Sequence, residues 1–219
     1  MEAHLNTPSE LCLTLPVTTR DAKQAHDILV AVLDTVPIAS VTLRSASGEL
    51  EAQTAKILID TMKKRGITAL VADNPELARS VKADGVHLSW NKDSATTYAD
   101  ARATLGERYV VGADAGRSRH DAMVLGEAGA DYVAFGIPPH VEDRNTAEHR
   151  QCDLIAWWSE IFEVACVACD VERPEHARYL AQAGADFIAV TVPIDLSPSD
   201  AVKWALEMQA AIATTGVAA

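Results

Sequence analysis

The stretch Ala83-Asp84-Gly85-Val86-His87-Leu88 is one of three related segments in the chain. The others are Gly129-Ala130-Asp131-Tyr132-Val133-Ala134-Phe135-Gly136 and Gly184-Ala185-Asp186-Phe187-Ile188-Ala189-Val190. Each follows a helix-like segment and consists of a small-residue turn, an Asp and a short apolar run, which is typical of a strand buried on both faces of a parallel sheet. The segments begin about 50 residues apart, roughly two strand–helix units, so the repetition predicts a closed (β/α)8 barrel, the TIM barrel.

The length and composition of the chain suit a single domain. With 219 residues it lies near the low end for an eight-stranded barrel, and 48% apolar residues supply a sizeable core. We expect one barrel domain over 1–219, with flexible ends at 1–10 and 214–219. The chain contains no run of 18 apolar residues, so we expect no membrane helix. Because the N-terminus also lacks the features of a signal peptide, we expect a cytoplasmic protein without membrane contact.

The net charge limits the classes of partner. The formal charge is −12, from 31 acidic residues against 19 Lys and Arg. This excess of acid argues against a nucleic-acid-binding surface, which requires a basic face. A small phosphorylated ligand remains compatible with it, because two Arg and a helix N-terminus can hold an anion locally. The sequence leaves open a homo-oligomer.

Cys166 and Cys169 match the pattern C-x-x-C, which occurs in redox and metal sites. No second C-x-x-C accompanies them to complete a zinc site. Because positions three apart on a strand face opposite sides, we interpret them as two apolar strand residues.

Periodicity and turn residues divide the chain into eight strand–helix units. Pro16 is expected to stop the first strand, and a long loop is expected from Ile137 to about Glu148. Besides the three related segments, we expect strands at 11–15, 38–43, 67–71, 109–112 and 164–168, and helices at 21–34, 49–65, from 75, and at 95–105, 119–127, 154–162, 173–183 and 197–213.

In such a barrel the active site lies at the C-terminal ends of the strands. Candidate polar residues at these ends are Arg44, Asp73, Asn74, His87, Trp90, Lys92, Asp93, Asp114, Arg117, Arg119, His140, Arg144 and Asp170. Arg44 suits a phosphate or carboxylate, with a plain salt bridge as the alternative. Asp73 suits Mg²⁺, or else forms the turn before Pro75. His87 is either a ligand or proton-transfer group or a hydrogen-bonded core residue, and His140 is read as a surface residue.

The chain resembles the thiamine-phosphate synthase and thiazole tautomerase family over residues 11–213. The segment 72–88 resembles the family's N-D-x-x-x-L-A…G-A-D-G-V-H-L-G-Q, and 129–136 resembles G-A-D-Y-V-G-F-G-P. The resemblance implies joining a hydroxymethylpyrimidine diphosphate to a thiazole phosphate, with Mg²⁺ and release of diphosphate. It implies catalytic roles for Arg44 and His87, substrate contacts from Arg44, Asp73, Trp90, Phe135 and Gly136, and Mg²⁺ ligands at Asp73 and Asp93.

Several positions depart from the family's motifs. The family's Q-x-R-x-K keeps only Arg44, Lys92 stands where a Mg²⁺ carboxylate belongs, and the glycine pair that would hold the thiazole phosphate is replaced near Asp170. We also expect the indole of Trp90 to reduce the pyrimidine pocket. The alternatives to a synthase are a catalytically degenerate relative that binds a thiamine-related ligand, another small phosphorylated ligand or a partner protein without turnover, and an enzyme with another reaction in the same barrel.

Overall fold

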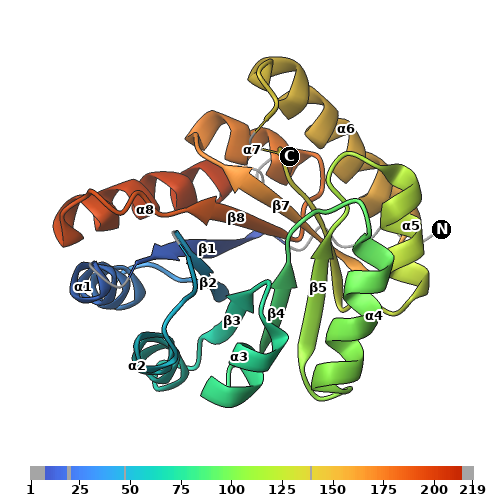
Figure 1. The fold of residues 1–219 in the computed structure, drawn as a ribbon. Helices are drawn as coiled ribbons and strands as arrows, with labels where there is room; N and C mark the ends of the chain where they lie inside the picture. Colours follow the sequence, from blue (N-terminus) through green and yellow to red (C-terminus); the bar gives the residue numbers. More distant parts are fainter. Residues whose placement is uncertain (1–7, 19–20, 47, 139, 214–219) are drawn as a thin grey trace.

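The computed structural model describes residues 8–18, 21–46, 48–138 and 140–213. Eight parallel strands, each followed by a helix, close into a barrel in the order β1 to β8, as the sequence predicts. Figure 1 shows the helices arranged outside the ring of strands. The elements are β1 Glu10–Val17, α1 Ala22–Leu33, β2 Ser40–Ser45, α2 Ala52–Lys63, β3 Thr68–Ala72, α3 Pro75–Val81, β4 Gly85–Leu88, α4 Ser94–Leu105, β5 Val110–Asp114, α5 Arg119–Glu127, β6 Tyr132–Phe135, α6 Arg144–Ile161, β7 Ala165–Val171, α7 Pro174–Gln182, β8 Phe187–Thr191 and α8 Pro198–Ala213.

The Asp of each related segment explains the repetition. Each Asp forms two hydrogen bonds with the second residue of the preceding strand. The Asp backbone N–H donates to the carbonyl of that residue, and the Asp Oδ2 accepts its backbone N–H. The pairs are Asp84 with Ala69, Asp131 with Val111 and Asp186 with Cys166, with N···O distances of 2.7–3.1 Å. These carboxylates lie at the N-terminal ends of the strands, the face associated with stability rather than catalysis.

Replacing Asp131 with Ala is expected to lower the free energy of unfolding by about 1–3 kcal/mol, because the Val111 N–H loses its acceptor and Arg102, at 2.6 Å, loses its ion-pair partner. The matched variant Asp131→Asn keeps an acceptor oxygen and should lose less. Urea unfolding of the two variants measures the difference, and equal losses would contradict the assigned role of the backbone bond.

Three expected boundaries are wrong. β1 does not stop at Pro16 but continues to Val17. Its pairing with β8 ends at Thr14, so within the described residues β8 does not need the backbone N–H that Pro16 lacks. The expected long loop is short, since α6 begins at Arg144, where the Asp143 side chain accepts from the Thr146 N–H. β7 extends beyond Ala168 to Val171.

The expectation of flexible ends concerns mostly residues outside the described part of the chain, namely 1–7 and 214–219. Residues 8–10 correct it where the structure describes them. Ser9 is buried and its hydroxyl donates to the Ala185 carbonyl at 2.6 Å, while Glu10 already begins β1. The chain is therefore held on the barrel from Ser9 onward.

Two apolar layers result from the alternation of side chains along the strands. The outer layer packs against the helices and contains Cys166, whereas Cys169 faces the barrel interior. The interpretation of the C-x-x-C as strand residues on opposite sides is therefore confirmed, and all four cysteines are free thiols. Within the described ranges, no helix has both the length and the apolar character needed to cross a membrane.

Candidate active site

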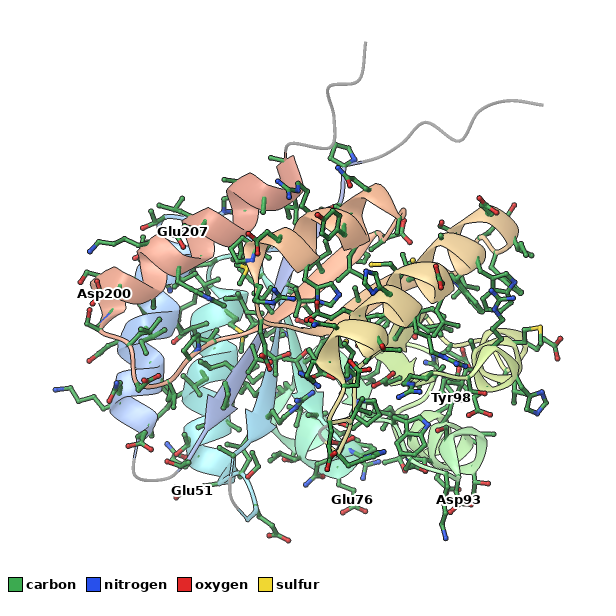
Figure 2. All side chains as sticks on the ribbon, turned by 90° about the horizontal axis from the view of Figure 1, so that it is seen from above. Glu51, Glu76, Asp93, Tyr98, Asp200 and Glu207 are labelled. Atoms are coloured by element: carbon green, nitrogen blue, oxygen red, sulfur yellow. The ribbon has the colours of Figure 1, made fainter. Side chains whose placement is uncertain are left out.

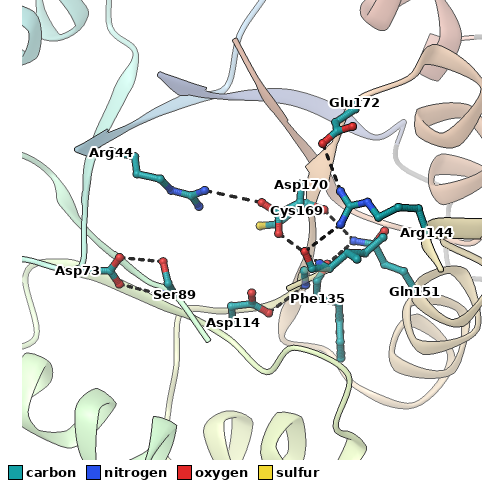
Figure 3. A network of polar contacts seen from close by, with 12 residues as sticks. Arg44, Asp73, Ser89, Asp114, Phe135, Arg144, Gln151, Cys169, Asp170 and Glu172 are labelled. Carbon is teal, nitrogen blue, oxygen red and sulfur yellow. Dashed lines mark hydrogen bonds and ion pairs between the residues drawn. The ribbon is translucent and has the colours of Figure 1, made fainter. Parts of the chain in front are cut away.

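Polar side chains from five strands converge at the C-terminal mouth of the barrel (Figure 3). Arg44 extends from the end of β2 across the mouth to Asp170 of β7, where its Nη1 lies 3.7 Å from the Asp170 Oδ1. Asp114 ends β5 and Gly136 follows β6. At this side of the mouth the Arg44 guanidinium therefore faces the carboxylate of Asp170, and Arg144 lies close by, bonded to the Ile137 carbonyl and to Glu172.

Asp73 is fixed at the opposite side of the mouth. It adopts a left-handed backbone conformation with φ of 57° directly after β3. Its Oδ1 accepts the N–H of Ser89 at 2.7 Å, and its Oδ2 accepts the Ser89 hydroxyl at 2.8 Å. The exposed carboxylate is thus held in one orientation before any ligand arrives.

Asp114 and Asp170 approach each other over Gly136. Asp114 Oδ1 accepts the N–H groups of Gly116 and Gly136 at 2.7 and 3.0 Å, and Asp170 Oδ2 accepts the N–H of Ile137 at 3.2 Å. A Cβ atom at Gly136 would lie 2.5 Å from Asp114 Oδ2 and 2.8 Å from Asp170 Oδ2. Gly136 is therefore the position that allows both carboxylates to approach.

The pKa of Asp114 is raised to about 7, mainly by burial and also by the neighbouring Asp170 charge, whereas the two backbone hydrogen bonds and Arg44 oppose the shift. Asp114 therefore changes protonation near neutral pH, and a group of this kind can give or take a proton in the mouth. The sequence named Asp114 and Asp170 only as polar strand ends. Their approach depends on barrel closure and on Gly136, which no local pattern reveals.

Gln151 of α6 joins the ends of two strands beneath this acid pair. Its Nε2 donates to the carbonyl of Phe135 and, at 2.8 Å, to the carbonyl of Cys169. The side chain is buried. Sequence reasoning missed it because this part of α6 was not expected to be helical, so nothing indicated which way the amide would point.

His87 faces the barrel interior rather than the open mouth. The ring is buried and its Nδ1 lies 2.9 Å from the hydroxyl of Tyr132. Burial lowers the pKa of His87 to about 4, with the Arg44 charge adding to the shift and Asp73 opposing it. The imidazole is therefore neutral at physiological pH, and its catalytic role stays a prediction.

Phe135 lies differently from what the resemblance implies. The Phe135 side chain points to the helix layer, where its ring contacts Trp158 edge-on at 5.9 Å between centroids. The alternation along β6 explains this, since 134 and 136 face inward. This ring therefore does not reach the mouth, and the substrate contact expected of Gly136 stays a prediction. Trp90 packs against Gly116, where a Cβ would lie 2.6 Å from the Trp90 Cδ1.

His140 faces the same aromatic residue. The ring centroids of Trp90 and His140 are 6.4 Å apart, and the two residues come from the loops that follow β4 and β6. Whether the Trp90 indole narrows a pyrimidine pocket stays a prediction.

The residues expected to bind Mg²⁺ are only partly organised for it. Asp93 is exposed at the start of α4, on the edge of the molecule that also carries Glu51 and Glu76 in Figure 2, and its side chain makes no capping bond. Among the residues described, no three or more His, Cys, Asp and Glu are grouped to hold a metal. Mg²⁺ commonly uses one or two carboxylates plus phosphate oxygens, so the fixed Asp73 fits as a ligand for a magnesium bound to a diphosphate.

Comparison with known proteins identifies relatives of this barrel. The model of the family described as thiamine monophosphate synthase matches residues 14–194. The chain is 34% identical over 193 residues to a thiamine-phosphate synthase of Erythrobacter litoralis, covering 86% of this chain and 89% of that protein. It is 39% identical over 166 residues to one of Rhodospirillum centenum, covering 74% and 78%.

Solved structures share the fold. A thiamine phosphate pyrophosphorylase from Pyrococcus furiosus superposes with a TM-score of 0.73 at 19% identity, covering 97% of this chain and 98% of that one. A tryptophan synthase from M. tuberculosis gives the same TM-score at 12% identity, covering 94% and 93%. At these identities the superpositions establish the barrel alone. The family match over most of the barrel and the two close sequence relatives show that the chain belongs to the thiamine monophosphate synthase family.

Proposed function

We propose that this barrel joins a hydroxymethylpyrimidine diphosphate to a thiazole phosphate. In this reaction the bond between the pyrimidine methylene carbon and the diphosphate oxygen breaks, the thiazole nitrogen forms a new bond to that carbon, and diphosphate leaves. The relatives at 34% and 39% identity are named for this activity, and they cover most of the chain. The observation that carries the proposal is the mouth itself, where Arg44 and a fixed Asp73 face the space a diphosphate would occupy.

Arg44 supports the proposal through its incomplete pairing. Its ion pair with Asp170 is long, at 3.7 Å, and its Nε is buried without a hydrogen-bond partner among the described residues. A guanidinium in this state can turn its fork to a diphosphate, whose oxygens accept two parallel hydrogen bonds. The charge that develops on the leaving diphosphate is then stabilised by a cation already in place.

Asp73 would hold the magnesium that accompanies the diphosphate. Bound there, Mg²⁺ would neutralise charge on the leaving group. Ser89 keeps both Asp73 oxygens in a fixed orientation, so this carboxylate meets the metal without reorganising.

The acid pair favours the second candidate, a barrel that binds a ligand without turnover. Asp170 stands where the resemblance places backbone N–H groups for the thiazole phosphate, and Asp114 lies beside it. Two carboxylates repel a phosphate dianion, unless one of them is protonated. The raised pKa of Asp114 removes part of this repulsion at neutral pH, which keeps the synthase as the leading proposal.

The test is an assay for thiamine phosphate and diphosphate from the two substrates. We expect both products in equal amounts, dependent on Mg²⁺, and a loss of activity on Asp73→Asn. Asp100→Asn, an exposed position on α4, serves as the matched control and should behave as wild type. Substrate binding without product would support the second candidate, and neither binding nor product would overturn the synthase proposal.

A further inference from the structure

The interior of the barrel contains a cavity of about 170 Å³ below the mouth. Its lining comes from inward-facing strand residues, among them Cys12, Thr42, His87, Tyr132, Cys169 and Ala189. Barrel interiors are usually filled by layers of bulky branched side chains. Here several inward positions carry Cys, Thr, Ala or Gly, so the layers do not close the space.

Side chains that face the barrel interior keep accessible surface, whereas side chains that face the helices are almost fully buried. On β1, β2 and β8 the inward-facing Thr14, Thr42 and Ala189 remain 7–9% exposed, whereas the outward-facing Leu13, Val41 and Ile188 are at most 2% exposed. In a fully packed barrel the inward-facing side chains would be buried at least as completely as the outward-facing ones, because both lie in the middle of strands. The inward-facing side chains therefore surround a space that they do not fill.

The opening lies on the face away from the mouth. Ser40, Thr68 and Phe187 line the same cavity, and each stands at the start of its strand, at the N-terminal end of the barrel. All three are partly exposed. The cavity is thus reached without passing Arg44 or the acid pair.

The lining offers hydrogen bonds that the described residues leave unused. The Tyr132 hydroxyl lies 2.9 Å from the Nδ1 of His87, and within the described ranges no hydrogen bond is found for the His87 Nε2 or the Thr42 hydroxyl. The His87 and Tyr132 rings are nearly parallel, with centroids 6.0 Å apart. Such groups can exchange hydrogen bonds with a molecule that enters the cavity.

The lining carries no Asp, Glu, Lys or Arg. Its titratable groups also stay neutral, because burial lowers the pKa of His87 to about 4, raises that of Cys12 to about 11 and raises the pKa values of Cys169 and Tyr132 well above their usual range. A charged ligand would lose its hydration here without gaining an opposite charge. The chemistry of the lining therefore selects uncharged molecules.

We propose that the barrel interior is a second binding site, separate from the mouth, for a small uncharged ring compound that carries one hydrogen-bonding group. The size follows from the volume, since an internal cavity of about 150 Å³ accommodates benzene. The polar group of the ligand would bond Thr42 or the His87–Tyr132 pair, and the ring would lie against the thiols and Ala189. This proposal does not depend on the synthase activity.

The first experiment compares three probes of nearly equal shape, namely benzyl alcohol, benzylamine and benzoate. Benzyl alcohol is expected to raise the Tm by about 2–4 °C at roughly five times its dissociation constant. It should also shift the ring resonances of His87 in an NMR titration. Benzylamine and benzoate, which are charged at neutral pH, should bind at least ten-fold more weakly. Equal binding of all three, or no binding of benzyl alcohol at millimolar concentration, would overturn the proposal.

The second experiment fills the cavity. Ala189→Leu should abolish benzyl alcohol binding, and the milder Ala189→Val should weaken it, which keeps the test decisive if the larger residue prevents folding. Ala99→Leu, at an exposed position of α4, makes the same change outside the cavity and should bind as wild type. Unchanged binding in the Ala189 variants would place the ligand elsewhere and contradict the proposal.

Discussion

Replacing Arg44 with Met is expected to lower kcat/KM for the condensation by about 100- to 1,000-fold, the usual effect of removing one group that stabilises charge in the transition state. Met keeps much of the side-chain volume and removes the cation that faces the leaving diphosphate. Lys is not an equivalent replacement, because it cannot present two parallel donors, so Arg44→Lys should recover only part of the activity. Steady-state kinetics with the pyrimidine diphosphate as the varied substrate measures both variants.

Stability separates this catalytic effect from a structural one. The pair between Arg44 and Asp170 is long and partly exposed, so its loss should change the free energy of unfolding by less than about 1 kcal/mol. Arg108→Met, an exposed position before β5, is the matched control and should retain full activity. Activity of Arg44→Met within three-fold of wild type would remove Arg44 from the proposed site.

Replacing Asp114 with Asn is expected to make the protein more stable than wild type above pH 7. The difference in the free energy of unfolding between variant and wild type should be about 2–4 kcal/mol larger there than at pH 4. The pKa of Asp114 rises from 3.8 to about 7 on folding. The stability that its protonated form contributes is therefore fully present below about pH 4 and is lost as the pH rises to about 7. Asn keeps an oxygen for the N–H groups of Gly116 and Gly136 but cannot ionise, so it avoids this loss.

The variant must be compared with wild type because His87 titrates over the same pH range and changes the free energy of unfolding in the opposite direction. Its pKa falls from 6.5 to about 4 on folding, so its contribution is present above pH 6.5 and is lost as the pH falls to about 4. The two groups partly cancel in the wild-type curve. Urea unfolding of both proteins at pH 4.5, 6 and 8 isolates Asp114.

A control follows from the neighbouring acid. Because the Asp170 charge raises the pKa of Asp114, Asp170→Asn should move the pH dependence of the wild type to lower pH. A difference between Asp114→Asn and wild type that is the same at all three pH values would show that Asp114 does not titrate near neutrality.

The sequence predicts the barrel well because the fold depends on local, repeated signals. Small-residue turns, a repeated Asp and unbroken apolar runs mark the strands, and caps such as Asn74 before Pro75 mark the helices. The errors have tertiary causes. Pro16 is tolerated only because β8 no longer pairs with that part of β1, which no property of the segment itself reveals.

The site is harder to predict, since its properties arise between distant segments. The strand-end rule identifies Arg44, Asp73, Asp114 and Asp170, but the approach of the two acids over Gly136 requires the closed barrel. The same holds for Gln151, which joins β6 to β7, and for the direction of Phe135. The interior cavity depends on the combined size of side chains from all eight strands, a quantity that no single motif encodes.

Calorimetric titration of wild type and Arg44→Met with the pyrimidine diphosphate, with and without Mg²⁺, tests the proposed diphosphate site most directly. Wild type should bind in a Mg²⁺-dependent manner, and Arg44→Met should bind at least ten-fold more weakly under the same conditions. Absence of binding to wild type at millimolar ligand, or equal binding to both proteins, would contradict the assignment of the mouth to a diphosphate.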